Sequence, residues 1–210
     1  MPDDVRSIAR SYFPDGTSPA HDWHHVERVV RTAATLVAES PEADARVVRL
    51  AALLHDIGRA REDAGEVADH AEWGADEATR VLESRGEDPE TVAAVAHCVR
   101  AHRFSNDVAP ATLEAKLLSD ADNLDALGAV GVARCFAHGG ELGSPIYDPD
   151  LPPDEDETAA GRTQYNHLQK KLLALPDRMY TEAGRRRAEE RAAFVRSFAD
   201  RLSAEAAGER

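Results

Sequence analysis

The chain has 210 residues, a formal net charge of −14 and a pI near 5.0. A chain of this length is expected to form one domain, 1–210, whose core is large enough to fold without disulfides. The acidic composition argues against duplex nucleic acid and anionic membrane surfaces as partners, because binding to phosphates requires clustered Lys and Arg.

The sequence has no apolar run as long as a membrane span and does not open on a basic segment followed by an apolar one. Its two cysteines, Cys98 and Cys135, form no CxxC pair and predict no disulfide framework. We therefore expect a cytoplasmic protein, either a monomer or a homodimer. The excess of carboxylates over lysines leads to the hypothesis that this cytoplasm is rich in salt.

Helical periodicity dominates the N-terminal part of the chain. No segment alternates apolar and polar residues at period two for any length, so we expect an all-α fold, a compact helical bundle. The helix around Leu50 is apolar on more than one face, which is typical of a central helix. The predicted helices in this part cover about 3–13, 22–40, 41–57, 67–85 and 88–102.

The C-terminal part is predicted to be helical on both sides of a long loop. A sixth helix starts near Leu113 and continues through 124–136, where Gly128 and Gly131 indicate the close approach of another helix. Residues 139–157 are rich in Pro, Gly and acidic residues and predict a loop, either a lid or a disordered excursion. The remaining chain, 158–210, is expected to form C-terminal helices packed on the core, over about 158–175 and 179–205.

The most informative stretch runs from Leu50 to Gly58, where five apolar residues lead directly into His55 and Asp56. Burying a charged group without a partner is heavily penalised, and a cation that both residues can ligate would compensate. The stretch therefore predicts a metal-binding pair at the C-terminal end of a buried helix.

Further ligands are expected on other helices. His21 and His25 are four residues apart and share a helix face, and Asp120 and Asp122 follow an apolar run. Four mixed N and O ligands without a thiolate favour one Mn, Fe, Ni, Co or Mg ion over a closed structural zinc site. Taken separately, the His55-Asp56 pair could simply end a helix and Asp122 could cap one. Only the combination of these residues favours a metal site.

Three segments carry a resemblance to a known family. His25-Val-Glu-Arg-Val, Leu54-His-Asp-Ile-Gly58 and Asp120-Ala-Asp-Asn-Leu-Asp-Ala-Leu-Gly128 resemble the HD-domain superfamily of metal-dependent phosphohydrolases, in particular its small single-domain hydrolases. The resemblance implies an HD-type bundle with the metal site between central helices. It also implies one divalent ion whose ligands are His25, His55, Asp56 and Asp122, with Asp120 as the alternative to the last.

The resemblance further implies hydrolysis of a phosphate ester or anhydride, with a nucleotide of the (d)NTP or NMP class as substrate. Asp56 and His55 are the expected catalytic residues, because they lie beside the activated water. The local positive charge that a phosphoryl group needs must come from a few side chains in so acidic a protein. The expected substrate-binding residues are His21, Arg59, His70, His102, Arg103 and Lys116, although Lys116 has equal standing as an ordinary surface lysine.

The sequence is also compatible with other functions. His70 and His102 could hold a second iron in a binuclear HD-fold oxygenase, but Arg103 stands where two-metal phosphodiesterases have another histidine, which favours one metal. A non-catalytic nucleotide-binding or sensing module would keep the ligand set without turnover. A purely structural helical protein would not need the His55-Asp56 pair.

Overall fold

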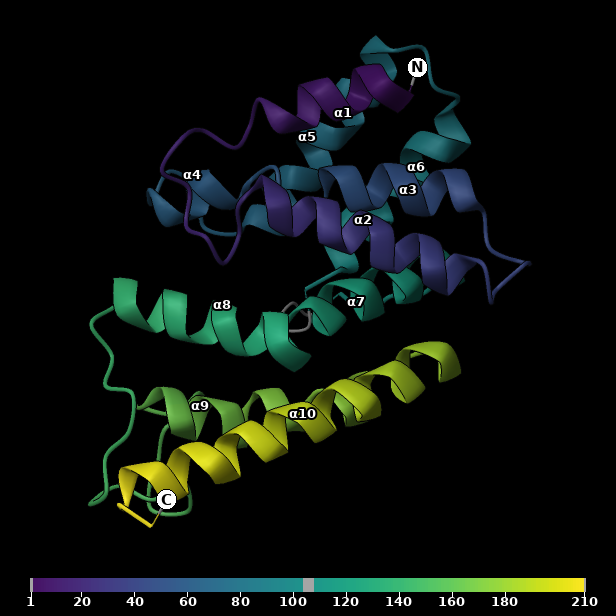
Figure 1. Cartoon of the computed structure of the whole chain (residues 1–210). Coiled ribbons are helices and arrows are strands. Elements are labelled where there is room, and N and C mark those ends of the chain that lie inside the picture. The colour runs from purple at the N-terminus through teal and green to yellow at the C-terminus, as the bar shows by residue number, and fades with distance from the viewer. Residues whose placement is uncertain (1, 104–107, 210) are drawn as a thin grey trace. The chain divides into compact units, whose positions relative to one another are not determined.

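The computed structural model describes residues 2–103 and 108–209, and every regular element in these ranges is helical (Figure 1). The prediction of an all-α fold is confirmed. In these two ranges no helix is both long and apolar enough to cross a membrane. The helices are α1 (Pro2–Arg10), α2 (Trp23–Val37), α3 (Ala45–Leu54), α4 (Arg59–Asp63), α5 (His70–Ser84), α6 (Pro89–Ala101), α7 (Leu113–Asp125), α8 (Gly128–Glu141), α9 (Gln164–Lys170) and α10 (Glu182–Ala206), with short 3₁₀ turns at Leu172–Ala174 and Pro176–Arg178.

Aspartate caps fix the starts of the helices that carry the candidate site. Asp22, Asp44, Asp69 and Asp88 precede α2, α3, α5 and α6, and each side chain accepts hydrogen bonds from backbone N–H groups of the first turn. These N–H groups have no partner within the helix, so a cap of this kind stabilises a helix by about 1 kcal/mol. A local sequence signal therefore determines where each of these helices begins.

The chain divides into two compact units, Met1–Asp122 and Asn123–Arg210. Within the first unit α3 packs against α1, α2 and α6, while α5 packs along α6. The side chains of Leu50, Leu53 and Leu54 are at most 2% exposed, so α3 is the central helix that its apolar pattern predicts. Its C-terminal end therefore delivers His55 and Asp56 into a buried region.

Most predicted helices differ from the structure by up to three residues at an end, and three of them differ by more. The third helix starts at Ala45 and not at Pro41, because Asp44 caps it. Residues 124–136 are not one helix, since Leu127 is extended and Gly128, the first residue of α8, adopts φ +70°. The predicted helix 158–175 is reduced to α9 and a 3₁₀ turn.

Asp156 explains the late start of α9 in the second unit. Its buried side chain accepts hydrogen bonds from the Thr158 backbone and hydroxyl, from the Arg162 backbone and from Asn166 Nδ2. These bonds hold residues 156–162 in a loop, and the Thr163 side chain then caps α9. The loop predicted over 139–157 begins later than expected, since α8 continues to Glu141.

Candidate metal centre

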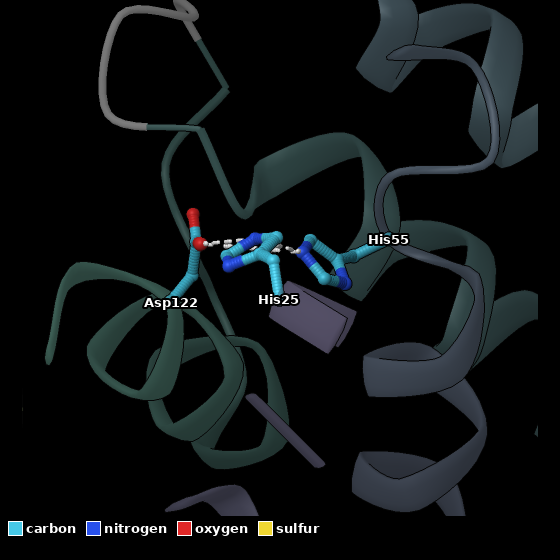
Figure 2. A group of neighbouring side chains, drawn as sticks. All are labelled: His25, His55 and Asp122. Atoms are coloured by element: carbon cyan, nitrogen blue, oxygen red, sulfur yellow. Dashed lines mark hydrogen bonds and ion pairs between the residues drawn. The ribbon is translucent and has the colours of Figure 1, made fainter. Parts of the chain in front are cut away.

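Three donor atoms from three helical segments meet at one buried point (Figure 2). His25 lies on α2, His55 follows α3 and Asp122 lies on α7. His25 Nε2 lies 3.3 Å from His55 Nε2 and 3.3 Å from Asp122 Oδ1, and the His55 Nε2 to Asp122 Oδ1 distance is 4.0 Å. Both histidines are fully buried, whereas the Asp122 side chain is 27% exposed.

The end of α3 sets the orientation of the His55 ring. His55 Nδ1 lies 2.9 Å from the Ala52 carbonyl oxygen, which is one of the carbonyls left without a partner at a helix C-terminus. Because a carbonyl oxygen only accepts, Nδ1 carries the proton and donates it. Burial lowers the pKa of His55, so the ring is neutral and its Nε2 lone pair points into the cluster.

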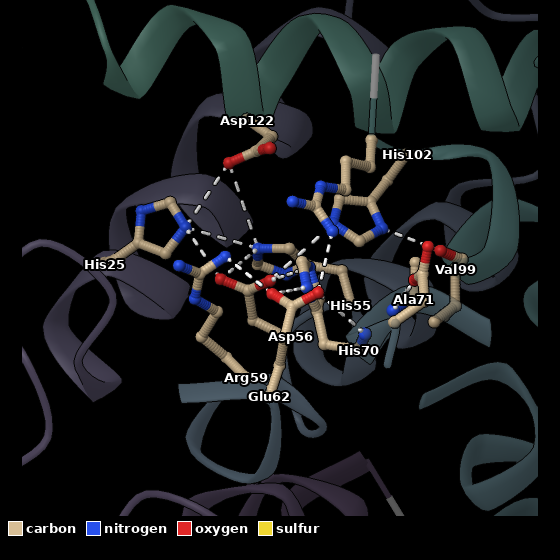
Figure 3. A network of polar contacts seen from close by, with 12 residues as sticks. His25, His55, Asp56, Arg59, Glu62, His70, Ala71, Val99, His102 and Asp122 are labelled. Atoms are coloured by element: carbon tan, nitrogen blue, oxygen red, sulfur yellow. Dashed lines mark hydrogen bonds and ion pairs between the residues drawn. The ribbon is translucent and has the colours of Figure 1, made fainter. Parts of the chain in front are cut away.

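Asp56 connects this cluster to a second one (Figure 3). Its Oδ2 lies 3.5 Å from His25 Nε2 and 3.6 Å from His55 Nε2. Its Oδ1 lies 3.2 Å from His70 Nε2 and 3.6 Å from His102 Nε2. Burial would raise the pKa of this carboxyl, but the surrounding histidines outweigh it and hold the pKa well below the usual range, so Asp56 is an anion.

The donor set around His25 fits a divalent cation. Ligand bonds of about 2.0–2.2 Å place neighbouring donors roughly 3–4 Å apart around a shared ion, which is the spacing found here. Two imidazole Nε2 atoms that lie 3.3 Å apart beside two carboxylates suit a cation between them. His25, His55 and Asp122 thus form a group that could hold a metal, with Asp56 Oδ2 next to it.

The second cluster contains Asp56, His70 and His102, all buried. His102 follows α6 as His55 follows α3, and its Nδ1 lies 2.6 Å from the Val99 carbonyl oxygen. Burial would lower the pKa of His102, but the Asp56 carboxylate outweighs this effect and raises it. The two clusters share Asp56, so the region between α2, α3, α5, α6 and α7 contains donors for one ion or two.

Several other residues that the sequence singled out have different surroundings. Asp120 is buried on α7 and belongs to none of the potential metal groups found among the described residues. The His21 ring stands edge-on to His25, with centroids 5.9 Å apart. Lys116 is half-buried on α7. Arg59 and Arg103 lie beside the second cluster and both form ion pairs with Glu62.

Glu62 is the site residue that the sequence did not reveal. It lies on α4, its side chain is 17% exposed, and its Oε2 lies 2.9 Å from His70 Nδ1. A carboxylate in a polar segment such as Arg59-Ala-Arg-Glu-Asp is typical of a solvated surface. No local signal in the sequence distinguishes Glu62 from its exposed neighbours Asp63 and Glu66.

Comparison with known proteins agrees with this geometry. The HD domain model matches residues 22–127, which include both clusters. The chain belongs to the HD-domain family. The uncharacterised protein YpgQ of Bacillus subtilis is 34% identical over 208 residues, which cover 97% of this chain and 93% of YpgQ.

Solved structures of similar proteins cover almost the whole HD-domain chain. Bacillus subtilis YpgQ in complex with ADP matches with a TM-score of 0.76 and 31% identity, over 98% of this chain and 97% of that one. An HD-superfamily hydrolase from Bacillus thuringiensis matches with a TM-score of 0.75 and 32% identity, over 97% and 95%. The chain is therefore an HD-superfamily hydrolase with a His/Asp cluster that could hold a metal.

Proposed function

We propose that this HD-domain protein is a metal-dependent phosphohydrolase that cleaves a phosphate ester or anhydride of a nucleotide. The observation that carries the proposal is the convergence of His25, His55 and Asp122 within 3.3–4.0 Å, with the Asp56 anion beside them. The ADP complex of YpgQ, a relative that covers nearly the whole chain, supports a nucleotide as the substrate class. The proposed location is the cytoplasm.

A divalent ion in this site would supply Lewis acidity at a phosphoryl oxygen and lower the pKa of a water. The chain's own residues then have separate tasks. His25, His55, Asp56 and Asp122 would hold the ion, and Asp56 would also orient the attacking water and accept its proton. His70 and His102 are placed at the other oxygen of Asp56, where they can face phosphate oxygens. Arg59 and Arg103 would contribute positive charge at the margin.

The decisive test is a screen for release of phosphate and pyrophosphate from nucleotides with Mn²⁺, Mg²⁺, Co²⁺ and Ni²⁺, at low and high salt. We expect metal-dependent release by the wild type and loss of at least about a thousandfold in Asp56→Ala, because both the ion site and the proton acceptor are damaged. Asp76→Ala is the matched control, since it removes an exposed carboxylate of α5, and it should retain full activity. Absence of any release that Asp56→Ala abolishes would refute the proposal.

A binuclear HD-fold oxygenase is the second candidate, and one observation favours it. Asp56, His70 and His102 form a second potential metal group that shares Asp56 with the first. Metal analysis separates the candidates: about one ion per chain supports the phosphohydrolase, whereas two irons per chain and uptake of oxygen would support the oxygenase. Nucleotide binding without turnover with any ion would instead indicate a sensing module.

A further inference from the structure

Glu62 is the side chain on which three elements around the second cluster converge. Its Oε2 lies 2.9 Å from His70 Nδ1 and 3.1 Å from Arg59 Nη1. Its Oε1 accepts hydrogen bonds from Arg103 Nη1 at 2.8 Å and from the His70 backbone N–H at 3.4 Å. One carboxylate on α4 is therefore bonded to the first residue of α5 and to the residue that follows the α6 cap.

Three of the four histidines around Asp56, namely His55, His70 and His102, differ in the acceptor that faces Nδ1. His55 and His102 stand at helix C-termini, where the free carbonyls of Ala52 and Val99 accept the Nδ1 proton. His70 is the first residue of α5, and a helix N-terminus presents N–H groups and no free carbonyl. The His70 ring therefore needs an acceptor from outside its own helix, and Glu62 provides it.

Glu62 determines whether Nδ1 of His70 carries a proton, while Asp56 Oδ1 faces Nε2 on the other side of the ring. Burial would raise the pKa of this carboxyl, but hydrogen bonds from His70 and Arg103 outweigh burial and lower it below its ordinary value. An ionised carboxylate is only an acceptor, so Nδ1 must be the donor. The ring is then oriented with Nε2 directed at Asp56 Oδ1, 3.2 Å away.

We propose that Glu62 is a positioning residue, which fixes the orientation and the Nδ1-protonated form of His70 so that Nε2 faces Asp56. The two arginines hold the carboxylate in place, Arg59 at Oε2 and Arg103 at Oε1, and Figure 3 shows Arg59 beside Glu62. A carboxylate that orients a histidine at its second nitrogen is a recurrent device beside metal sites, and removing such a partner lowers activity or metal affinity by about 10–100-fold. The effect of Glu62 on turnover rests on the proposed function, whereas its effect on His70 does not.

Nitrogen NMR tests the positioning directly. Long-range ¹H–¹⁵N spectra of the ¹⁵N-histidine-labelled, metal-free protein near pH 8 would report which His70 nitrogen is protonated, with His70→Ala identifying the signals. We expect a protonated Nδ1 in the wild type and in Glu62→Gln, whose amide oxygen still accepts. Glu62→Ala should lose the Nδ1-protonated form or show both tautomers. Should Glu62→Ala not fold, Glu62→Asp replaces it, because its shorter side chain draws the acceptor away and predicts the same loss.

Glu66→Ala is the matched control. Glu66 follows α4, is 56% exposed and pairs with Arg61, so its removal should leave the His70 spectrum unchanged. An Nδ1 proton that is absent in the wild type, or that persists fully in Glu62→Ala, would overturn the proposal.

A double-mutant cycle tests the effect on catalysis. Glu62→Ala should lower kcat by about 10–100-fold with a smaller change in KM and with metal content unchanged, and Glu62→Gln should restore part of the loss. Because Glu62 acts through His70, the double variant with His70→Ala should be no worse than His70→Ala alone. Additive losses, or loss of bound metal in Glu62→Ala, would overturn the proposed role. If the wild type itself releases no phosphate, the proposed function fails, while the NMR result still decides whether Glu62 positions His70.

Discussion

At the scale of single residues, Asp56 differs from an ordinary metal ligand in that its two oxygens face different pairs of histidines. Oδ2 faces His25 and His55, and Oδ1 faces His70 and His102. The adjacency of His55 and Asp56 in the sequence predicts that both are buried together. The sequence does not predict that the two oxygens face different histidines. That arrangement requires His70 at the start of α5 and His102 at the end of α6 to lie beside Oδ1.

The sequence alone does not decide whether Asp120 or Asp122 is the metal ligand on α7. Both lie on α7, and residues two apart on a helix point about 160° away from each other, so only one of them can face His25. The structure places Asp122 Oδ1 3.3 Å from His25 Nε2. The packing of α7 sets its rotation about its own axis, and this rotation determines that Asp122 and not Asp120 faces His25.

Metal binding by two matched variants tests the assignment of Asp122. Asp122→Asn removes the charge that faces the two histidines and should weaken Mn²⁺ binding by at least about tenfold, since the loss of even an outer partner of a ligand has an effect of this size. Asp120→Asn should retain wild-type affinity. Isothermal titration calorimetry of both variants, with circular dichroism to verify folding, measures the difference. Stronger loss of Mn²⁺ binding in Asp120→Asn would reverse the assignment.

At the scale of elements, Gly58 determines how closely α4 can approach α5. A Cβ added at Gly58 would lie 2.5 Å from the His70 carbonyl oxygen and 3.0 Å from Trp73 Cε3. No real side chain tolerates the first of these distances, so any larger residue must displace the start of α5. Gly58 thereby links the His-Asp segment to the position of His70.

Gly58→Ala should therefore lower the free energy of unfolding by about 1–3 kcal/mol, as overpacking of a close contact does. Gly140→Ala is the contrast, because a Cβ added at Gly140 in α8 would meet no atom within 4 Å and alanine favours a helix by up to about 1 kcal/mol. Urea denaturation of both variants measures the change. Equal stability of Gly58→Ala and the wild type would contradict the close approach.

Element boundaries show what local sequence can and cannot predict. The capping aspartates before α2, α3, α5 and α6 are local signals, and the helices that follow them start where the caps place them. The late start of α9 has a different cause, since buried Asp156 accepts bonds from residues up to Asn166 and holds the intervening chain in a loop. The prediction of a helix over 158–175 is wrong because the bonds to Asp156 depend on the burial of its carboxylate, which the local sequence does not reveal.

At the scale of the whole molecule, the net charge of −14 is the dominant physical property. Like charges destabilise a compact chain through mutual repulsion, and salt screens that repulsion over a Debye length of about 30 Å at 0.01 M and about 3 Å at 1 M. The hypothesis of a high-salt cytoplasm rests on this screening, because salt would reduce the repulsion among the excess carboxylates. It would lose support if the protein were folded and fully active at low ionic strength.

Thermal unfolding in KCl tests the role of repulsion. We expect the midpoint to rise by several degrees between about 0.01 M and 1 M KCl, because screening relieves repulsion among the excess carboxylates. Differential scanning calorimetry at fixed pH measures the shift, and sucrose at matched osmolality controls for general exclusion from the surface. A midpoint that is constant or falls with KCl would contradict the expectation.

The sequence by itself determined the helical class, the central position of α3 and the burial of His55 with Asp56, because periodicity and apolar content act locally along the chain. It also identified the residues His25 and Asp122, which the structure brings together from α2 and α7. Only the tertiary structure decided that Asp122 and not Asp120 faces His25, and that Glu62 supports His70. Both decisions depend on the rotation and contact of helices distant in sequence, which no local pattern encodes.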